Sequence, residues 1–309
     1  MANSPLPRAD IGVIGGSGFY SFFADAIRVR VPTPFGEPSD EIVVGDVSGR
    51  AVAFVARHGQ GHRFPPHRVN YRANLWALRM LGVRQVLAPC AVGSLRPELT
   101  PGTIVVPDQV VDRTWGRAHT VYDEPGPVVH VSFADPFCPR GRAAALDPGA
   151  AQAPGETPSP GAAALAGAAA LDPGAAQAPG TTPASPVVDG GTLVVINGPR
   201  FSTAAEARWH QSAGWSLVGM TTMPEAAIAR ELAMCFTTIA LVTDHDAGID
   251  GANQVTHADV LAVFAENMRA FKERLRATVA ALPDPQDDAG ATCGCRRALD
   301  GLTLPFTLP

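Results

Sequence analysis

Short apolar runs that each end in small or polar residues recur along this chain, and they constrain its fold more than any other feature. The runs are rich in Val, Ile and Leu, and they have the length of buried strands. Residues with the apolar spacing of helices follow several of them, for example at 70–78, 204–214 and 256–275. This alternation predicts a three-layer α/β/α domain around a mixed sheet. The strand-like runs are 11–14, 52–55, 86–95, 103–106, 190–196, 217–219 and 238–242.

The run 238–242 leads into two aspartates, Asp244 and Asp246, and then into a glycine. Residues two positions apart on a strand face the same side, so both carboxylates should point out from its carboxyl end, where open α/β sheets bind ligands. Repulsion between them raises one pKa, and that group then carries a proton near neutral pH. Such a pair can hold an amino group and a ring nitrogen of a base. The alternative for these residues is an Asx turn.

Three further strand ends carry groups that suit an anion. The run 11–14 enters a glycine-rich turn with Ser17, whose hydroxyl and neighbouring N–H groups can bind a phosphate. The dinucleotide fingerprint G-x-G-x-x-G is not met there, which argues against an NAD-dependent enzyme. Arg57 and His58 follow the run 52–55 and form a predicted phosphate clamp. Thr221 precedes a helix start at Pro224, where the helix dipole favours negative charge.

Two other strand ends suit close ligand contact. Small residues such as Ala91 end the run 86–95 and let a ligand approach the backbone. Phe201 follows the run 190–196, and an aromatic ring placed there can stack on a planar base. A core phenylalanine is the alternative for Phe201.

Composition excludes several classes of protein. Charged residues make up 17% of the 309 residues and the net charge is -5, so neither a nucleic-acid partner nor a membrane partner is expected. An N-terminus without signal-peptide features and an odd number of cysteines predict a cytoplasmic protein. Two of the five cysteines, Cys293 and Cys295, lie very close together in the sequence and have too few further ligands near them. The sequence therefore does not predict a four-ligand zinc site there.

Residues 146–186 differ in composition from the rest of the chain. The sequence AAALDPGAAQAPG at 143–155 recurs unchanged at 168–180, and the segment has no aromatic residues and almost no charge. It cannot bury enough apolar surface to offset the entropy of ordering, so we predict a disordered, dispensable insertion. The chain is therefore divided into an N-terminal tail (1–9), a single domain (10–282) that contains the insertion, and a C-terminal tail (283–309).

Taken together and in order, the motifs resemble the purine nucleoside phosphorylase family, specifically the trimeric branch that includes 5′-methylthioadenosine phosphorylase. The resemblance covers nearly all of residues 10–282 apart from the insertion. The matching motifs are GGSGF, ARHG, HRFPPHRVNYRANLWAL, AVGSLR, PDQVVDRT, HVSFADPFCP, NGPRFST, GMTTMPEA and VTDHDAG.

The resemblance implies a role for each matching residue. Phosphate would be bound by Ser17, Arg57, His58, Cys90, Ala91 and Thr221, with Cys90 standing where relatives commonly have threonine. The nucleoside would be bound by Phe201, Ser202 and Met220 and by the catalytic aspartates Asp244 and Asp246, with Asp244 addressing N7 and the 6-amino group. His130 would reach the 5′ pocket of a neighbouring subunit, and His257 stands where an apolar residue lines that pocket in the animal enzyme.

The implied reaction is phosphorolysis of a purine nucleoside, with S-methyl-5′-thioadenosine as the expected substrate in methionine and purine salvage. No metal or organic cofactor is expected, because inorganic phosphate is the co-substrate. A homotrimer is expected from the branch. The alternatives are a general phosphorylase for adenosine or 6-oxopurine nucleosides and a non-catalytic nucleoside-binding module. An aspartate at 244 favours 6-aminopurines, since relatives that prefer 6-oxopurines carry an asparagine there.

Overall fold

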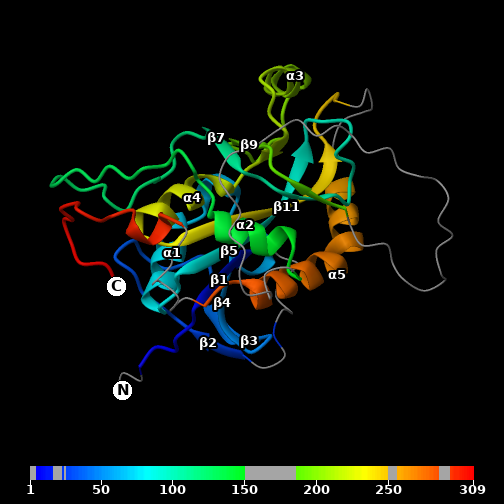
Figure 1. The fold of residues 1–309 in the computed structure, drawn as a ribbon. Coiled ribbons are helices and arrows are strands. Elements are labelled where there is room, and N and C mark those ends of the chain that lie inside the picture. Colours follow the sequence, from blue (N-terminus) through cyan, green and yellow to red (C-terminus); the bar gives the residue numbers. More distant parts are fainter. Residues whose placement is uncertain (1–4, 17–22, 24–25, 150–185, 250–255, 285–292) are drawn as a thin grey trace.

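The structure is a computed structural model that describes residues 5–16, 23, 26–149, 186–249, 256–284 and 293–309. The strands of these residues form one mixed sheet with eleven strands. Helices pack on it, as Figure 1 shows. The α/β prediction is therefore confirmed.

The predicted strands and helices are present in the predicted order, together with elements that the sequence pattern did not predict. The strands are β1 (Ile11–Gly15), β2 (Ala26–Val29), β3 (Ile42–Val47), β4 (Arg50–Ala56), β5 (Gln85–Ser94), β6 (Ile104–Val106), β7 (Gln109–Arg113), β8 (Val187–Asp189), β9 (Thr192–Ile196), β10 (Leu217–Gly219) and β11 (Cys235–His245). The helices are α1 (Tyr71–Met80), α2 (Pro139–Leu146), α3 (Ala204–Ser212), α4 (Thr222–Glu231) and α5 (His257–Ala281). None of the helices described is both long enough and apolar enough to cross a bilayer.

Successive residues of the central strands belong to two different apolar clusters. In β1, Val13 packs into one cluster and Ile14 into the other, and in β11 Leu241 and Val242 divide in the same way. Helices α1 and α4 cover the cluster that contains Ile14, while α2 and α5 cover the cluster that contains Val13. The two-residue period of the strands thus gives the sheet two buried faces and produces the three layers.

Strand β5 runs through the middle of the sheet and has an interrupted edge. On one side it pairs with β11 along its whole length, with a register shift between Val242 and Asp244. On the other side β1 pairs with residues 85–87, and β10 pairs with residues 93–94. No strand of the described residues pairs with that edge over residues 88–92. This gap in the sheet is the place where a ligand can approach the backbone of β5.

The predicted insertion, 146–186, lies almost wholly on residues 150–185, which are outside the described residues. The chain on each side of it is part of the core. Helix α2 packs against α5 immediately before it, and β8 pairs in parallel with β6 immediately after it. The first residues of the repeated sequence, 143–146, complete helix α2.

We expect replacement of residues 150–185 by a Gly–Ser linker of about ten residues to leave turnover within a few-fold of the parent. The reason is that loop-closure entropy changes only slowly with length, and the segment's composition cannot form a core. The two proteins are compared by the rate of the phosphorolysis that the sequence resemblance implies and by their thermal melting temperatures. A replacement variant that fails to fold would show that the segment contributes to the core.

The C-terminal segment 293–309 packs on the domain. Near its end, the Phe306 ring lies 5.5 Å from Trp76 of α1 and 5.2 Å from Tyr122 between ring centroids. Aromatic pairs at these separations stabilise a packed segment.

The beginning of this segment contradicts one sequence prediction. Cys293 and Cys295 are buried next to Cys138 and Cys235, which the fold brings from distant parts of the chain. The prediction that the pair has too few partners for a four-ligand site is therefore wrong. The two further cysteines are distant in sequence, so the local spacing of residues does not reveal them.

Candidate functional site

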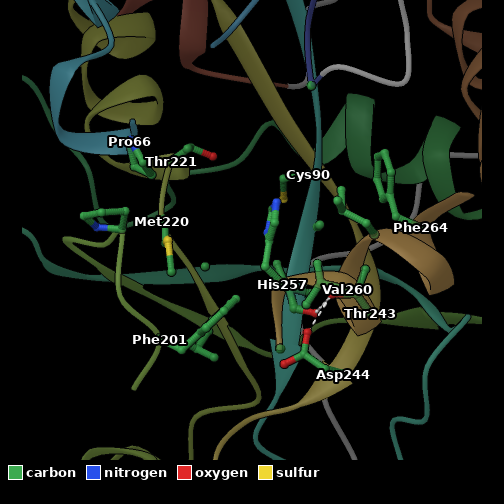
Figure 2. A pocket seen from close by; sticks show the side chains of 18 of the residues that line it. Pro66, Cys90, Phe201, Met220, Thr221, Thr243, Asp244, His257, Val260 and Phe264 are labelled. Atoms are coloured by element: carbon green, nitrogen blue, oxygen red, sulfur yellow. Dashed lines mark hydrogen bonds between the residues drawn. The ribbon is translucent and has the colours of Figure 1, made fainter. Parts of the chain in front are cut away.

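A cavity of about 990 Å³ lies at the gap along β5. In Figure 2, Thr221 and Cys90 lie at one end of the cavity, Phe201 and Asp244 lie at the other, and Met220 lies between them. Most of the predicted site residues line this single space. They are Arg57, His58, Cys90, Ala91, Phe201, Ser202, Met220, Thr221, Asp244, Asp246 and His257.

Asp244 lies at the end of β11, opposite Gly93 of β5, because the register shift there leaves Thr243 without a ladder partner. Thr243 Oγ1 donates a hydrogen bond of 2.7 Å to Asp244 Oδ1 (Figure 2). Burial raises the pKa of Asp244 to about 6; the Thr243 hydroxyl opposes this rise, and the charge of Asp246 adds to it. The predicted rise in pKa is confirmed. Its main cause is burial, and repulsion between the carboxylates is a smaller one.

Asp246 follows the last residue of β11 and is only 3% exposed. Its backbone N–H donates to the carbonyl of Ser94 at 2.9 Å, which fixes the chain beyond the strand. Its Oδ2 atom is buried without a hydrogen-bond partner among the described residues. Burial raises the pKa of Asp246. A buried carboxylate oxygen without a partner is unfavourable, so Asp246 is suited to accept a hydrogen bond from a ligand.

Arg57 follows β4 and is held by the carboxylate of Glu225, a residue that no local sequence pattern connects with it. Its Nε and Nη2 donate to the two carboxylate oxygens of Glu225 at 2.6 and 3.1 Å, and both side chains are almost fully buried. Nη1 donates to the carbonyl of Pro89 and Nη2 to that of Ile14. These bonds occupy four of the five guanidinium N–H groups. The remaining N–H, on Nη1, is therefore the group through which Arg57 can donate a hydrogen bond to phosphate.

His58 is neutral. Burial lowers its pKa to about 3, and the neighbouring Arg57 charge lowers it further. Its Nδ1 lies 2.8 Å from the carbonyl of Phe64, and because a carbonyl only accepts, Nδ1 carries the proton. Nε2 is then an acceptor, suited to a phosphate O–H rather than to a phosphate charge. The ring also stacks on His62 at 4.1 Å between centroids.

The end of the cavity at the start of α4 is rich in uncharged polar groups. Thr221 precedes α4, and the backbone of Met223 is not helical, so the regular helix begins at Pro224 as predicted. Burial raises the pKa of Cys90 to about 11, so its thiol is protonated at neutral pH. Cys90 and Ala91 lie on the part of β5 that faces the gap. Hydroxyl, thiol and backbone groups, rather than net positive charge, therefore dominate this end.

Helix α5 supplies an apolar wall. Val260, Leu261, Phe264 and Met268 line the cavity from four positions with helical spacing, and His257 is the first residue of the same helix. Figure 2 shows Val260 and Phe264 on one side of the cavity. This wall suits an apolar group on the ligand.

Phe201 lies opposite this wall in the same view (Figure 2). It lines the cavity and belongs to none of the apolar clusters of the described residues. Its position supports the stacking role over the alternative of a core phenylalanine.

The structure does not place two of the predicted residues in the cavity. Ser17 lies outside the described residues, although Gly16 before it lines the cavity. His130 is exposed and is not among the lining residues. A role for His130 within its own chain is not supported by this geometry.

Gly93 is a site residue that the sequence did not single out. A Cβ atom at this position would lie 3.0 Å from Asp244 Oδ2 and 3.0 Å from a methyl group of Val218. A larger residue at position 93 would push the Asp244 carboxylate and the Val218 methyl group by a few tenths of an ångström. The motif AVGSLR includes this glycine, but it gives no sign of the contact with a strand far along the chain.

We expect Gly93→Ala to lower kcat/KM for the phosphorolysis that the sequence resemblance implies. The loss should be roughly 10-fold or more, because the added methyl group displaces the Asp244 carboxyl group. Gly12→Ala is the matched control. A Cβ at Gly12 also meets a side chain at 3.0 Å, that of Val83, but Gly12 does not line the cavity. Overpacking should destabilise both variants by about 1–3 kcal/mol, and only Gly93→Ala should lose turnover. Equal kinetics in the two variants would show that the Gly93 contact is not needed.

Comparisons with known proteins agree with this geometry. The family model "Phosphorylase superfamily" matches residues 10–280. A "Purine nucleoside phosphorylase" from Streptomyces coelicolor is 52% identical over 316 residues and covers 100% of both chains. An "S-methyl-5'-thioadenosine phosphorylase" from Mycolicibacterium smegmatis is 51% identical and covers 97% of this chain and 99% of its own.

A solved structure of methylthioadenosine phosphorylase from Schistosoma mansoni in complex with adenine has a TM-score of 0.74 and 35% identity to this chain. The alignment covers 88% of this chain and 91% of that one. Sequence, fold and cavity thus lead to one assignment: the chain belongs to the phosphorylase superfamily, and within it to the purine nucleoside phosphorylase family that includes the methylthioadenosine phosphorylases.

Proposed function

We propose that the protein catalyses phosphorolysis of S-methyl-5′-thioadenosine to adenine and 5-methylthioribose 1-phosphate. The observation that carries the proposal is the order of groups along the cavity. Hydroxyl and backbone groups lie at one end, an apolar wall lies along a side, and a carboxyl group with a pKa of about 6 lies at the other end. This order matches a phosphate, a 5′-methylthio group and a purine base.

The chemistry needs little beyond these groups. A phosphate oxygen attacks the anomeric carbon while the bond to N9 of the purine breaks, and the bonding electrons move into the base. A proton from Asp244 to N7 neutralises that charge, and general-acid catalysis of this kind contributes about 10²–10⁴-fold. Asp246, with a buried oxygen that has no hydrogen-bond partner in the part of the chain that the structure describes, steadies the base beside it. In this proposal the reaction uses no metal or organic cofactor, and inorganic phosphate is the second substrate.

The 5′ end of the substrate is assigned to helix α5. Val260, Phe264 and Met268 offer apolar surface to a methylthio group, whereas a free 5′-hydroxyl would lose its hydration there. His257 at the start of the helix is the polar group that can bind a hydroxyl instead. The alternative substrates are therefore adenosine and, with another base, 6-oxopurine nucleosides.

The assembly and location belong to the same proposal. A homotrimer would let His130, which is exposed and outside the cavity of its own chain, reach the 5′ end of a neighbouring cavity. We place the enzyme in the cytoplasm, where both phosphate and nucleosides are present.

One assay tests the proposal. Release of free base is measured from methylthioadenosine, adenosine and inosine, each with and without phosphate. We expect phosphate-dependent release of adenine, with the highest kcat/KM for methylthioadenosine. A higher kcat/KM for inosine would favour the 6-oxopurine alternative, and release without phosphate would mean hydrolysis. Binding without any release would identify a non-catalytic module.

A further inference from the structure

Four buried cysteines meet away from the cavity. The side-chain sulfur atoms all lie within 4.8 Å of one another, and those of Cys235 and Cys293 are 3.7 Å apart. None of the four lines the cavity described above. The residues are Cys138, Cys235, Cys293 and Cys295.

Two of them are fixed by regular structure. Cys138 lies immediately before α2, and its backbone N–H donates to the carbonyl of Phe236 at 2.8 Å. Cys235 is the first residue of β11, and its N–H donates to the carbonyl of Arg84 at 2.9 Å. The positions of both thiols therefore follow from the fold of the sheet. The C-terminal segment brings the other two thiols to this preformed pair.

The spacing of the sulfurs matches metal binding better than the other states of cysteine. With Zn–S bonds of about 2.3 Å, a tetrahedral site places its sulfurs about 3.8 Å apart. A disulfide would need about 2.05 Å, and all four cysteines are free thiols. Apolar packing accounts for a single buried cysteine. It gives no reason for four sulfurs from three parts of the chain to converge.

A neighbouring cation supplies an independent argument. The guanidinium of Arg230 in α4 is buried, and its Nη2 lies 3.9 Å from the sulfur of Cys295. It donates to the carbonyls of Ser132 and Asp135 at 2.9 and 2.6 Å, but it forms no ion pair with a carboxylate of the described residues. A buried cation needs a negative partner. Four thiolates around a divalent ion carry a net charge of about −2 and would provide it.

We propose that Cys138, Cys235, Cys293 and Cys295 bind one Zn²⁺ ion as thiolates. Each thiol releases its proton to solvent on binding, and no oxidation or reduction takes place. Because all four coordination positions are filled by protein sulfur, the ion has a structural role and takes no part in the phosphorolysis. It joins the C-terminal segment to α2 and β11, so the packing of Phe306 on Trp76 depends on it.

The test uses the full chain, expressed with zinc in the medium and purified under reducing conditions without chelators. Zinc is measured by mass spectrometry of the metal, and melting temperatures are recorded with and without a strong chelator. The variants Cys293→Ser and Cys295→Ser change the C-terminal ligands only, so the sheet can still fold. Cys90→Ser is the matched control for metal content, because Cys90 is the one cysteine outside the cluster.

We expect one zinc per chain in the parent and in Cys90→Ser, and at least a tenfold loss of zinc in the two C-terminal variants. The chelator should lower the melting temperature of the parent by roughly 5 °C or more and leave that of Cys293→Ser unchanged. Zinc retained equally by all variants would overturn the proposal. So would a parent protein that binds no added zinc, that holds iron instead, or whose intact mass reveals disulfides among these cysteines.

Discussion

Asp244→Asn should lower kcat/KM for methylthioadenosine by roughly two orders of magnitude or more, as removal of a general acid does. The carboxyl group with a pKa of about 6 can hold a proton for N7, and a carboxamide is a far poorer proton donor. The amide can donate to a 6-oxo group, so inosine should lose much less activity. The ratio of the two kcat/KM values should therefore move toward inosine. Steady-state kinetics with both nucleosides measure the change.

Asp246→Asn is the comparison for this variant, since the second aspartate lies beside the first and is given a supporting role. It should lose less activity and should not change the base preference. An Asp244→Asn enzyme with unchanged activity and preference would mean that the pair serves only as a turn at the end of β11.

Asp244→Asn should also make the protein more stable at neutral pH. Asp244 has a folded pKa of about 6 against an ordinary value of 3.8, so its ionisation disfavours the folded state as pH rises through that interval. Asparagine does not ionise, and its oxygen can still accept the hydrogen bond from Thr243. We expect a gain of about 1–3 kcal/mol at pH 7.5 that disappears near pH 4. Urea denaturation at both pH values tests it, and a less stable variant at pH 7.5 would contradict it.

Glu225→Gln should reduce both stability and phosphate binding. The change leaves the buried Arg57 guanidinium without its charged partner, and breaking a buried ion pair in this way costs about 3–5 kcal/mol. The amide nitrogen of Gln would also face an Arg57 N–H, donor against donor. Arg57 should then move from the cavity wall, and KM for phosphate should rise about 10-fold or more. Denaturation curves and kinetics at varied phosphate concentration measure the two effects.

Glu231→Gln on the same helix is the control, because it removes a buried carboxylate that does not hold Arg57. Glu231 is also buried, and its Oε2 accepts a hydrogen bond of 2.8 Å from the backbone N–H of Val121, but it does not line the cavity. A glutamine oxygen can accept the same hydrogen bond, so this variant should keep its KM for phosphate and should be much less destabilised than Glu225→Gln. If Glu225→Gln raised KM no more than Glu231→Gln, Arg57 would have no part in binding phosphate.

The sequence predicts those features that depend on neighbouring residues. The period of apolar residues locates the strands, and the groups at strand ends meet because β1 and the antiparallel β10 run toward each other and both end at the gap along β5. For this reason Asp244, Phe201 and Thr221 line one cavity as expected. The raised pKa of Asp244 follows from local sequence only in its direction, since its main cause, burial, depends on the whole fold.

Features that depend on distant pairs were missed. Glu225 lies 168 positions from Arg57, and no local pattern connects them. The neutral state of His58 depends mainly on burial, and the position of its proton depends on the carbonyl of Phe64, neither of which the residue types reveal. The cysteine cluster was missed for the same reason, because its members come from three segments without regular spacing.

The order of strands along the chain also affects how the protein folds during its synthesis. Strand β5 is made early, whereas β11, which pairs with it along its whole length, is the last of the described strands to leave the ribosome. Until then one edge of β5 and the apolar face later covered by α5 have no native partner. Unpaired strand edges and exposed apolar surface promote aggregation of nascent chains. The core therefore closes only after β11 and α5 have been made, and the unfinished sheet is prone to aggregation until then.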